Sequence, residues 1–381
     1  MRIKSIKSFI VNLNSPKNCC FVKVETDEGI SGWGECYTQS DRDIQISSHV
    51  DQLSRYLIGR DPAQIKNFTQ IGYDDFASKR GSMDLYSAIS GIEQALWDIK
   101  GKTLNTPVFQ LLGGKVRDEV RVYANGWSQG SKDPLELAER ASSVVEKGFD
   151  ALKFDPVPGP WRNFVGKDVV NTAIANVSAV REQVGPDVDI LIEIHRRLAP
   201  MHATTIAKQI EQYNPFWYEE PIQPENLDAL AEVRRKINIP VVTGEALYTK
   251  TAFRDVFAKR AADIINPDVC NVGGILELNE IAATAASHLV GVAPHNYNST
   301  GIGLASTIQC CATMPNFVIT EYFLNMEQVT SAVTEDPLVI KNGKIKLTDK
   351  PGLGVNLNEK ALVAHVSEIM PQRSLPENYN S

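Results

Sequence analysis

The sequence predicts two domains, an N-terminal α+β capping domain and a modified β/α barrel of the TIM type. Apolar runs of five or six residues recur through residues 119–330 and alternate with helix-length segments, which is the pattern of a parallel β/α barrel. Residues 1–37 instead alternate in polarity as strands do, and helical periodicity begins near Ile44. A meander followed by helices is typical of an α+β domain with its own core.

The capping domain is expected to span residues 1–118. Its predicted strands form a three-stranded meander at residues 1–13, 19–29 and 30–37, with turn residues between them. Helices are predicted over residues 47–59 and 83–104. In the second helix, Leu85, Ile89 and Ile92 fall on one face at helical spacing, and Gly101 is expected to mark its end.

The barrel is expected to span residues 119–330. Its eight predicted strands are VRVYANGW (120–127), ALKFDP (151–156), DILIEIH (189–195), FWYEEP (216–221), PVVTGE (240–245), DIINPD (263–268), GVAPH (291–295) and FVITEYF (317–323). Residues 331–381 form a tail that is rich in turn residues. We expect this tail to return to the capping domain and to close over the mouth of the barrel.

Composition argues against several classes of protein. The chain has 381 residues, enough for a barrel and a second domain, and a net charge of −7. It has no basic run, so binding to nucleic acid is not expected. No stretch reaches about eighteen uncharged apolar residues and the start alternates like a strand, so neither a membrane span nor a signal peptide is expected. The six cysteines lack zinc-site spacing, which is typical of buried thiols in a cytoplasmic protein.

Three glutamates share one register in the predicted barrel. Glu193, Glu219 and Glu245 lie 26 residues apart, each at the end of an apolar run. Side chains at the carboxyl ends of barrel strands point into the mouth, and three carboxylates there need a cation. Oxygen ligands suit a hard divalent ion, so the sequence predicts a Mg²⁺ site. A single such glutamate would be explained equally well by a salt bridge or a helix cap.

Neighbouring strand residues face opposite ways, so only one of Glu219 and Glu220 can point into the barrel. The 26-residue register selects Glu219 and leaves Glu220 with a structural role.

Two histidines lie at strand ends near these glutamates. His195 follows Glu193 by two residues, and alternation places both on the same side of the strand. His295 ends the seventh strand and Asp268 ends the sixth. A carboxylate that accepts a hydrogen bond from one imidazole nitrogen fixes the tautomer and raises the basicity of the other nitrogen. The alternatives are a core histidine for His195 and a turn residue after a proline for Asp268.

Several segments together resemble the enolase superfamily, in its mandelate racemase-like branch, over essentially the full length of the chain. The matching segments are GWGE (32–35), ALWDIKGK (95–102), KFDP (153–156), IEIH (192–195), EEP (219–221), TGE (243–245), NPD (266–268), VGG (272–274), PH (294–295) and KPGLG (350–354). Residues 123–127, 151–156 and 189–197 are most similar to sugar-acid dehydratases that act on gluconate or galactonate. The resemblance also implies a homo-oligomer, from dimer to octamer.

The resemblance assigns further residues to the site. Racemases of this branch carry two lysines on the second strand, but here Asp155 replaces the second, so only Lys153 remains and its expected partner is the substrate carboxylate. Glu321 would hydrogen-bond the other carboxylate oxygen if protonated, or form an ordinary salt bridge. Arg197 is expected to hold a substrate hydroxyl or to be solvated. Asp155 is also placed among the substrate-binding residues, together with Asn125 and Trp127, and packing explains Trp127 equally well.

The resemblance predicts a Mg²⁺-dependent hydro-lyase that converts an aldonate such as D-gluconate or D-galactonate to a 2-keto-3-deoxy acid through an enediolate. His295 would remove the C2 proton and His195 would protonate the departing C3 hydroxyl. In this branch the histidine of strand seven serves substrates of R configuration at C2. An epimerase, racemase or cycloisomerase acting on a sugar acid or its lactone remains the alternative, and a non-catalytic ligand sensor is a distant one. Residues 13–18 and 70–83 are expected to select the substrate.

Overall fold

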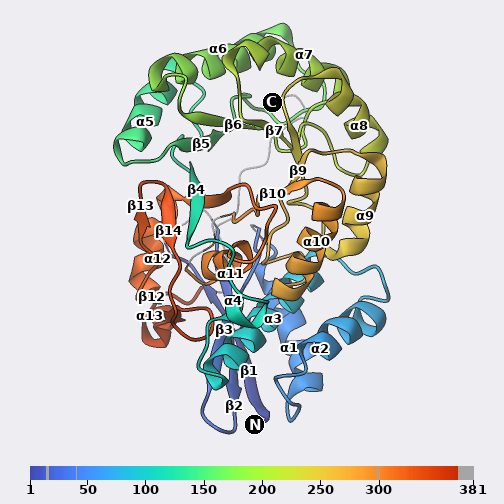
Figure 1. Cartoon of the computed structure of the whole chain (residues 1–381), viewed down its shortest axis with the longest axis vertical. Helices are drawn as coiled ribbons and strands as arrows, with labels where there is room; N and C mark the ends of the chain where they lie inside the picture. The colour runs from blue at the N-terminus through green and yellow to red at the C-terminus, as the bar shows by residue number, and fades with distance from the viewer. Residues whose placement is uncertain (14–16, 40, 298, 300, 368–381) are drawn as a thin grey trace.

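A computed structural model describes residues 1–13, 17–39, 41–297, 299 and 301–367. Figure 1 shows a barrel surrounded by a ring of helices, with the N-terminal sheet and its helices packed below. The strand topology confirms the predicted fold class, an α+β domain joined to a TIM-type barrel.

The capping domain is an antiparallel sheet covered by helices. Its strands, in the order β1-β2-β3, are β1 (Ile3–Val11), β2 (Cys19–Thr26) and β3 (Ser31–Cys36). Its helices are α1 (Asp43–Leu57), α2 (Ile65–Ile71), the π-helix η1 (Gly72–Phe76), α3 (Met83–Thr103) and α4 (Val108–Leu111). A Cβ atom on Gly34 would lie 1.8 Å from the carbonyl oxygen of Gly91. Glycine at this position therefore lets α3 lie directly on β3.

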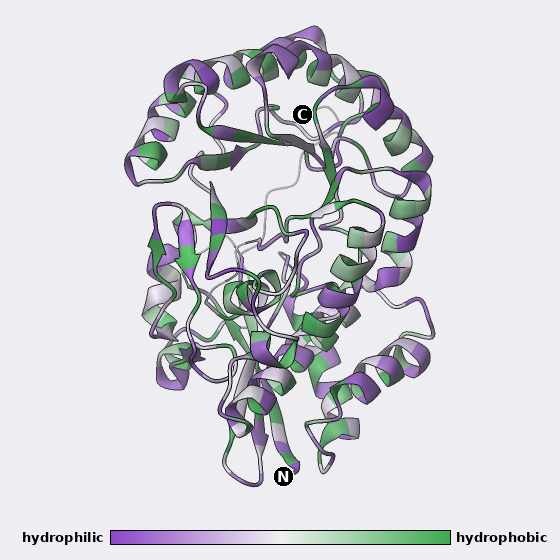
Figure 2. Ribbon diagram, viewed as in Figure 1, coloured by the Kyte–Doolittle hydropathy of each residue, from purple (hydrophilic) through white to green (hydrophobic). Residues whose placement is uncertain are grey.

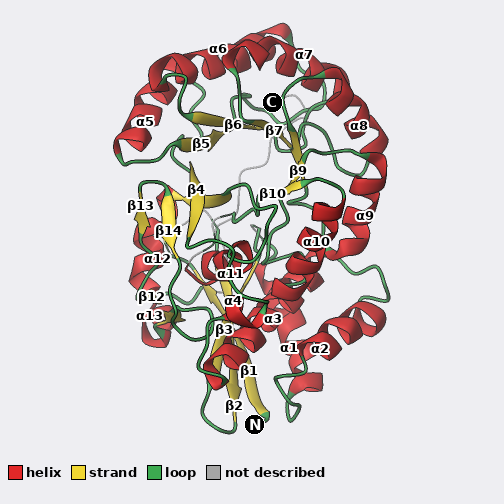
Figure 3. Cartoon of the chain, viewed as in Figure 1, coloured by secondary structure: helices red, strands yellow, loops and turns green. Residues whose placement is uncertain are grey.

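Among the described residues, eight parallel strands form the barrel (Figure 3), one in each predicted segment. They are β4 (Glu119–Asn125), β5 (Ala151–Phe154), β6 (Asp189–Glu193), β7 (Trp217–Glu219), β8 (Val241–Thr243), β9 (Ile264–Ile265), β10 (Gly291–Val292) and β11 (Thr320–Phe323). Each strand from β4 to β9 pairs with the next one along the chain, and β11 pairs with β4. A bridge between Val292 and Phe317 closes the ring.

Helices cover the outside of the barrel. They are α5 (Pro134–Glu146), α6 (Lys167–Val184), α7 (Pro200–Ile210), the 3₁₀ turn η2 (Glu211–Tyr213), α8 (Leu227–Lys236), α9 (Thr249–Lys259), α10 (Ile275–Ser287) and α11 (Gly301–Cys311). Figure 2 shows hydrophilic and hydrophobic residues alternating around the outer helices. In α5 the buried residues are Leu137, Ala141 and Val144, at the spacing of one helix face. In contrast, α11 is buried along its whole length.

The strands end earlier than the sequence predicted. β6 ends at Glu193, and His195 and Arg196 both adopt left-handed backbone conformations, with φ of 56° and 64°. Strand alternation therefore does not carry from Glu193 to His195, although both reach the same site. α3 also differs, because it runs past Gly101 to Thr103.

The C-terminal segment contacts both parts of the molecule. It contains η3 (Leu324–Met326), α12 (Glu327–Val333), β12 (Thr334–Glu335), β13 (Ile340–Lys341), β14 (Lys344–Lys346), β15 (Asn356–Leu357) and α13 (Glu359–Ala364). β14 pairs with the first residues of β4, at the end of the barrel opposite the mouth. This hairpin therefore does not close over the mouth, unlike what we expected of the tail as a whole. Later residues reach the capping domain, where Val366 bridges Val11. Residues 368–381 lie outside the described part, and the domain boundaries at 118 and 330 stay predictions.

Buried carboxylates join the capping domain to the barrel. Glu35 accepts a hydrogen bond from the backbone N–H of Gly303 at 2.9 Å, in the first turn of α11. Glu93 accepts from the N–H groups of Ile275 at 2.7 Å and Leu276 at 3.0 Å, at the start of α10. Negative charge is favourable at a helix N-terminus. Each carboxylate therefore joins a barrel helix to the capping domain.

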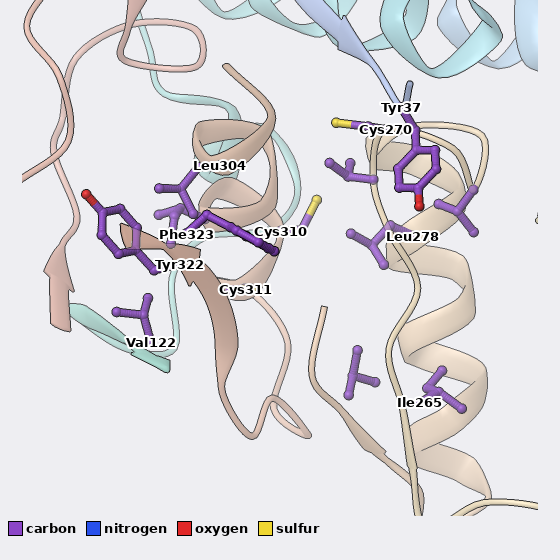
Figure 4. Close-up of a cluster of buried hydrophobic side chains, with 14 of the residues drawn as sticks. Tyr37, Val122, Ile265, Cys270, Leu278, Leu304, Cys310, Cys311, Tyr322 and Phe323 are labelled. Carbon is purple, nitrogen blue, oxygen red and sulfur yellow. The ribbon is translucent and has the colours of Figure 1, made fainter. Parts of the chain in front are cut away.

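Apolar residues fill the space around these contacts. Figure 4 shows Tyr37, at the end of the capping sheet, beside Cys270, and the backbone N–H of Tyr37 donates to the carbonyl of Cys270 at 3.0 Å. Cys310 and Cys311 belong to the same buried cluster. All six cysteines are buried and free, as the sequence predicted.

Replacing Glu93 with alanine is expected to destabilise the protein by about 3 kcal/mol. The change leaves the N–H groups of Ile275 and Leu276 and the indole N–H of Trp97 without their acceptor, and each unsatisfied buried group costs about 1–3 kcal/mol. Urea unfolding measures the change. Glu280→Ala, on the solvent-facing side of α10, the helix whose start Glu93 contacts, is the control and is expected to cost less than about 1 kcal/mol. Equal losses in both variants would contradict this role of Glu93.

Candidate active site

Three glutamates meet at the mouth of the barrel. Glu193 and Glu219 are directly paired residues at the ends of β6 and β7, and Glu245 follows β8. Each offers a carboxylate oxygen within 4.8 Å of the others, and all three side chains are buried. Charges this close in a buried site repel unless a cation lies among them. The cluster therefore fits a hard metal ion, which prefers carboxylate oxygens.

Lys153, on β5, places its ammonium group against this cluster. Its Nζ lies 2.8 Å from Glu219, 3.4 Å from Glu193 and 3.0 Å from Glu321 of β11. Burial alone would lower the pKa of Lys153, but the surrounding carboxylates outweigh burial and raise that pKa well above its usual value. Burial and the neighbouring Glu193 raise the pKa of Glu219. The site therefore holds a fixed positive charge and excess negative charge.

Glu220 lies outside the cluster. Its backbone has a φ of 45°, which turns the chain at the end of β7. One carboxylate oxygen accepts hydrogen bonds from the hydroxyl of Thr243 and the N–H of Gly244, both at 2.8 Å. Glu220 therefore ties β7 to the end of β8, while Glu219 faces the mouth.

His295 follows β10 and lies at the Glu245 side of the cluster. Its Nδ1 is 2.7 Å from Asp268, and its Nε2 is 3.1 Å from Glu245 and 3.5 Å from Glu321. Burial lowers the pKa of His295, but Glu245 and Glu321 outweigh burial and raise it well above its usual value. The contact with Asp268 fixes the ring orientation and leaves Nε2 directed at the carboxylates.

His195 lies at the opposite, Glu193 side of the cluster. Its backbone N–H donates to Glu193 at 2.7 Å, and its Nδ1 is 3.0 Å from Asp155. Trp161 stacks on its ring at a centroid distance of 5.1 Å. Burial opposes the charged ring, but Glu193 and Asp155 outweigh burial and raise the pKa of His195. The side chain of His195 is 32% exposed, compared with 4% for His295.

The structure places Asp155 and Arg197 behind His195. The Nη2 atom of Arg197 contacts Asp155 and donates to the carbonyl of Val157 at 2.6 Å, and the guanidinium lies 5.1 Å from the ring centre of Trp161. Arg197 is buried, so the alternative of a solvated arginine is wrong. Asp155 therefore supports His195 directly, and Arg197 supports it through Asp155. The sequence had placed both side chains against the substrate.

Asn125 and Glu321 form a polar pair on β4 and β11. The amide of Asn125 donates to Glu321 at 2.7 Å, and the backbone N–H of Asn296 donates to the other oxygen at 2.9 Å. Burial would raise the pKa of Glu321, but Lys153 and His295 outweigh burial and lower it. Glu321 therefore accepts hydrogen bonds and forms a salt bridge with Lys153, which matches the salt-bridge alternative and not the proton donor. Trp127 is buried and packs at 5.5 Å from the ring of Phe154, as the packing alternative described.

A hollow of about 430 Å³ opens beside His195. It is lined by Trp161, Arg162, Asn163, His195, Arg196, Arg197, Gln223 and Glu225. Sequence reasoning missed Trp161 and Arg196, because neither ends a strand. The only signals were an aromatic residue in the loop after β5 and the second basic residue of HRR (195–197).

The two segments expected to select the substrate lie in the capping domain. In the first, residues 14–16 are outside the described residues, and the ammonium group of Lys17 lies 3.9 Å from the ring centre of Tyr297. In the second, the hydroxyl of Tyr73 is 3.5 Å from that of Thr251, after β8. Beside Gly274, the last glycine of VGG (272–274), the space is taken by the carboxylate of Glu93, which accepts from the N–H of Ile275.

Two family models cover most of the chain. Residues 11–113 match the N-terminal domain of mandelate racemase / muconate lactonizing enzyme, and residues 136–361 match the enolase C-terminal domain-like family. The chain belongs to the enolase superfamily, in its mandelate racemase-like branch.

Among the relatives of this chain, a D-gluconate dehydratase of Thermoproteus tenax is 36% identical over 91% of this chain and 69% of its own length. D-galactonate dehydratase of Pectobacterium atrosepticum is 34% identical over 93% of this chain and 92% of its own length. D-xylonate dehydratase of Haloferax volcanii is 35% identical over 96% of this chain and 89% of its own length. Because dehydratases eliminate water, these relatives confirm the prediction of a hydro-lyase.

Solved structures agree with this assignment. A mandelate racemase/muconate lactonizing enzyme from Jannaschia sp. CCS1 has a TM-score of 0.90 and is 30% identical, over 98% of this chain and 99% of that one. A member of the enolase superfamily from Salmonella Typhimurium also has a TM-score of 0.90 and is 30% identical, over 95% of this chain and 97% of that one. Among the described residues, no helix has the length and apolar character needed to cross a membrane.

Glu219→Gln is expected to abolish divalent-ion binding, whereas Glu220→Gln is expected to retain it. Glu219 lies within the carboxylate cluster, and Glu220 accepts hydrogen bonds outside it. A glutamine at residue 220 can still accept these bonds through its carbonyl oxygen. Isothermal titration calorimetry of metal-stripped protein measures divalent-ion binding by both variants. Loss of binding in Glu220→Gln with retention in Glu219→Gln would show that the other glutamate faces the ion.

Proposed function

We propose that this enzyme dehydrates an aldonate to a 2-keto-3-deoxy acid and requires Mg²⁺ held by Glu193, Glu219 and Glu245. The observation that carries the proposal is the pair of histidines at the two sides of the glutamate cluster, each with a carboxylate on its Nδ1. Mg²⁺ would supply positive charge to stabilise the substrate carboxylate as a second negative charge develops. The dehydratase relatives support the reaction class.

The chain's own residues would divide the work between the two sides of the cluster. His295, oriented by Asp268, removes the C2 proton through Nε2, which faces the cluster. Lys153 adds fixed positive charge near the substrate carboxylate. His195, with Nδ1 held by Asp155, gives a proton to the leaving C3 hydroxyl. The resulting enol then tautomerises to the 2-keto acid.

The proposed substrates are acids of R configuration at C2. Asp155 stands where a second-strand lysine base would be, and its contacts with His195 and Arg197 support a positioning role. This leaves His295 as the base, the residue that serves 2R acids in relatives of this branch. D-gluconate, D-galactonate and D-xylonate, named for the relatives, are all 2R and share their configuration at C3. The hollow beside His195 would take the distal carbons.

Epimerisation at C2 is the second candidate. A proton-transfer group on each side of the cluster would also serve removal of a proton from one face and its return on the other. The product separates the two reactions, because only dehydration gives a ketone that reacts with semicarbazide.

A homo-oligomer and a cytoplasmic location stay predictions from the sequence.

A panel of C4–C6 aldonic and aldaric acids, assayed with semicarbazide in the presence of Mg²⁺, tests the proposed function. We expect turnover of at least one of D-gluconate, D-galactonate and D-xylonate, and none of D-mannonate, which is 2S. Rapid turnover of D-mannonate without any of the 2R acids would rule out His295 as the only base. A C2-epimerised product without ketone formation would favour the second candidate.

Replacing His295 and replacing His195 with asparagine are expected to block different steps of the reaction. His295→Asn should stop exchange of the C2 hydrogen with D₂O, because the base is lost. His195→Asn should retain that exchange and block loss of the hydroxyl. General acid–base groups contribute about 10²–10⁴-fold, so each variant should lose at least about 10²-fold in turnover. NMR in D₂O measures exchange and product together. Exchange that survives only in His295→Asn would reverse the two assignments.

A further inference from the structure

Arg196 has a backbone conformation that arginine rarely adopts. It follows His195 with a φ of 64°, in the left-handed region that favours glycine. Such conformations persist where surrounding contacts hold them, and they gather at functional sites. Here the backbone N–H of Arg196 donates to the carbonyl of Glu220 at 2.7 Å, and the guanidinium lines the hollow and reaches into the glutamate cluster.

The guanidinium lies against two glutamates at once. Its Nη1 contacts one carboxylate oxygen of Glu245 and lies 3.7 Å from Glu220. The other oxygen of Glu245 is 3.1 Å from the Nε2 of His295. The remaining members of the cluster, Glu193 and Glu219, face Lys153 instead. Arg196 therefore places a permanent positive charge on the Glu245 side.

We propose that Arg196 is an internal counter-ion that competes with the divalent ion for Glu245. It holds the carboxylates together before the ion arrives and moves toward Glu220 when the ion binds. A guanidinium and a metal ion neutralise the same carboxylate charge and repel each other, so each weakens the attraction of Glu245 for the other. Glu220 offers the displaced group a second carboxylate. The inference rests on the proposed function for the assignment of the ion to the three glutamates.

Magnesium titration of metal-stripped protein, without substrate, tests the proposal. Arg196→Gln should bind Mg²⁺ about tenfold more tightly than the original chain, because the competing charge is gone. The melting temperature of the stripped variant should fall, and addition of Mg²⁺ should recover more of it than in the original chain. Arg196→Lys keeps the charge and should lie between the two. Arg162→Gln removes an equal charge from the same hollow and serves as the matched control.

Unchanged or weaker Mg²⁺ binding in Arg196→Gln would overturn the inference, since weaker binding means that Arg196 orients Glu245 for the ion. An equal gain in Arg162→Gln would also overturn it, because the effect would then belong to the overall charge of the hollow. Failure of the original chain to bind Mg²⁺ would refute the metal site of the proposed function itself. Binding by the original chain with no gain in Arg196→Gln refutes only the role of Arg196.

Discussion

The close approach of three buried carboxylates is the constraint on which the rest of the site depends. Glu193, Glu219 and Glu245 bring oxygens within 4.8 Å of one another at the barrel mouth. Negative charge at this density needs positive partners in a buried site. Lys153 and Arg196 provide them from opposite sides. An arrangement that concentrates negative charge in this way suits a metal ion and chemistry in which a substrate carboxylate gains charge.

The same chemistry of carboxylates and N–H donors also joins the two parts of the molecule. Glu35 and Glu93 contact the first turns of α11 and α10. Asp98 accepts from the backbone of Trp33 at 3.0 Å and of Leu353 at 2.9 Å. The segments that resemble the superfamily therefore serve two physical purposes. Those at barrel strand ends form the carboxylate and histidine site. Residues 32–35 bond to α11 of the barrel through Glu35, and residues 95–102 bond to residues 350–354 of the C-terminal segment through Asp98.

His195 and His295 differ in their surroundings more than in the residues that orient their rings. Each has a carboxylate on Nδ1, but His295 is enclosed between Glu245 and Glu321 while His195 borders the hollow. Under the proposed function, His295 would act as the base in an enclosed site, where charges interact strongly. An acid that meets a leaving hydroxyl needs room for the remainder of the substrate. Under the proposed function, Trp161, which stacks on His195, would form one wall of that room.

The sequence by itself determined the eight strand positions, the register of the three glutamates and the pairing of Asp268 with His295. These follow from apolar periodicity, because parallel strands bring residues at their ends to one edge. Only the tertiary structure decided the roles of Asp155, Arg196 and Trp161. They lie beyond the last strand residues, and His195 itself reaches the site through a left-handed turn after Glu193. Periodicity ends where a strand ends, so contacts between loops depend on the folded chain.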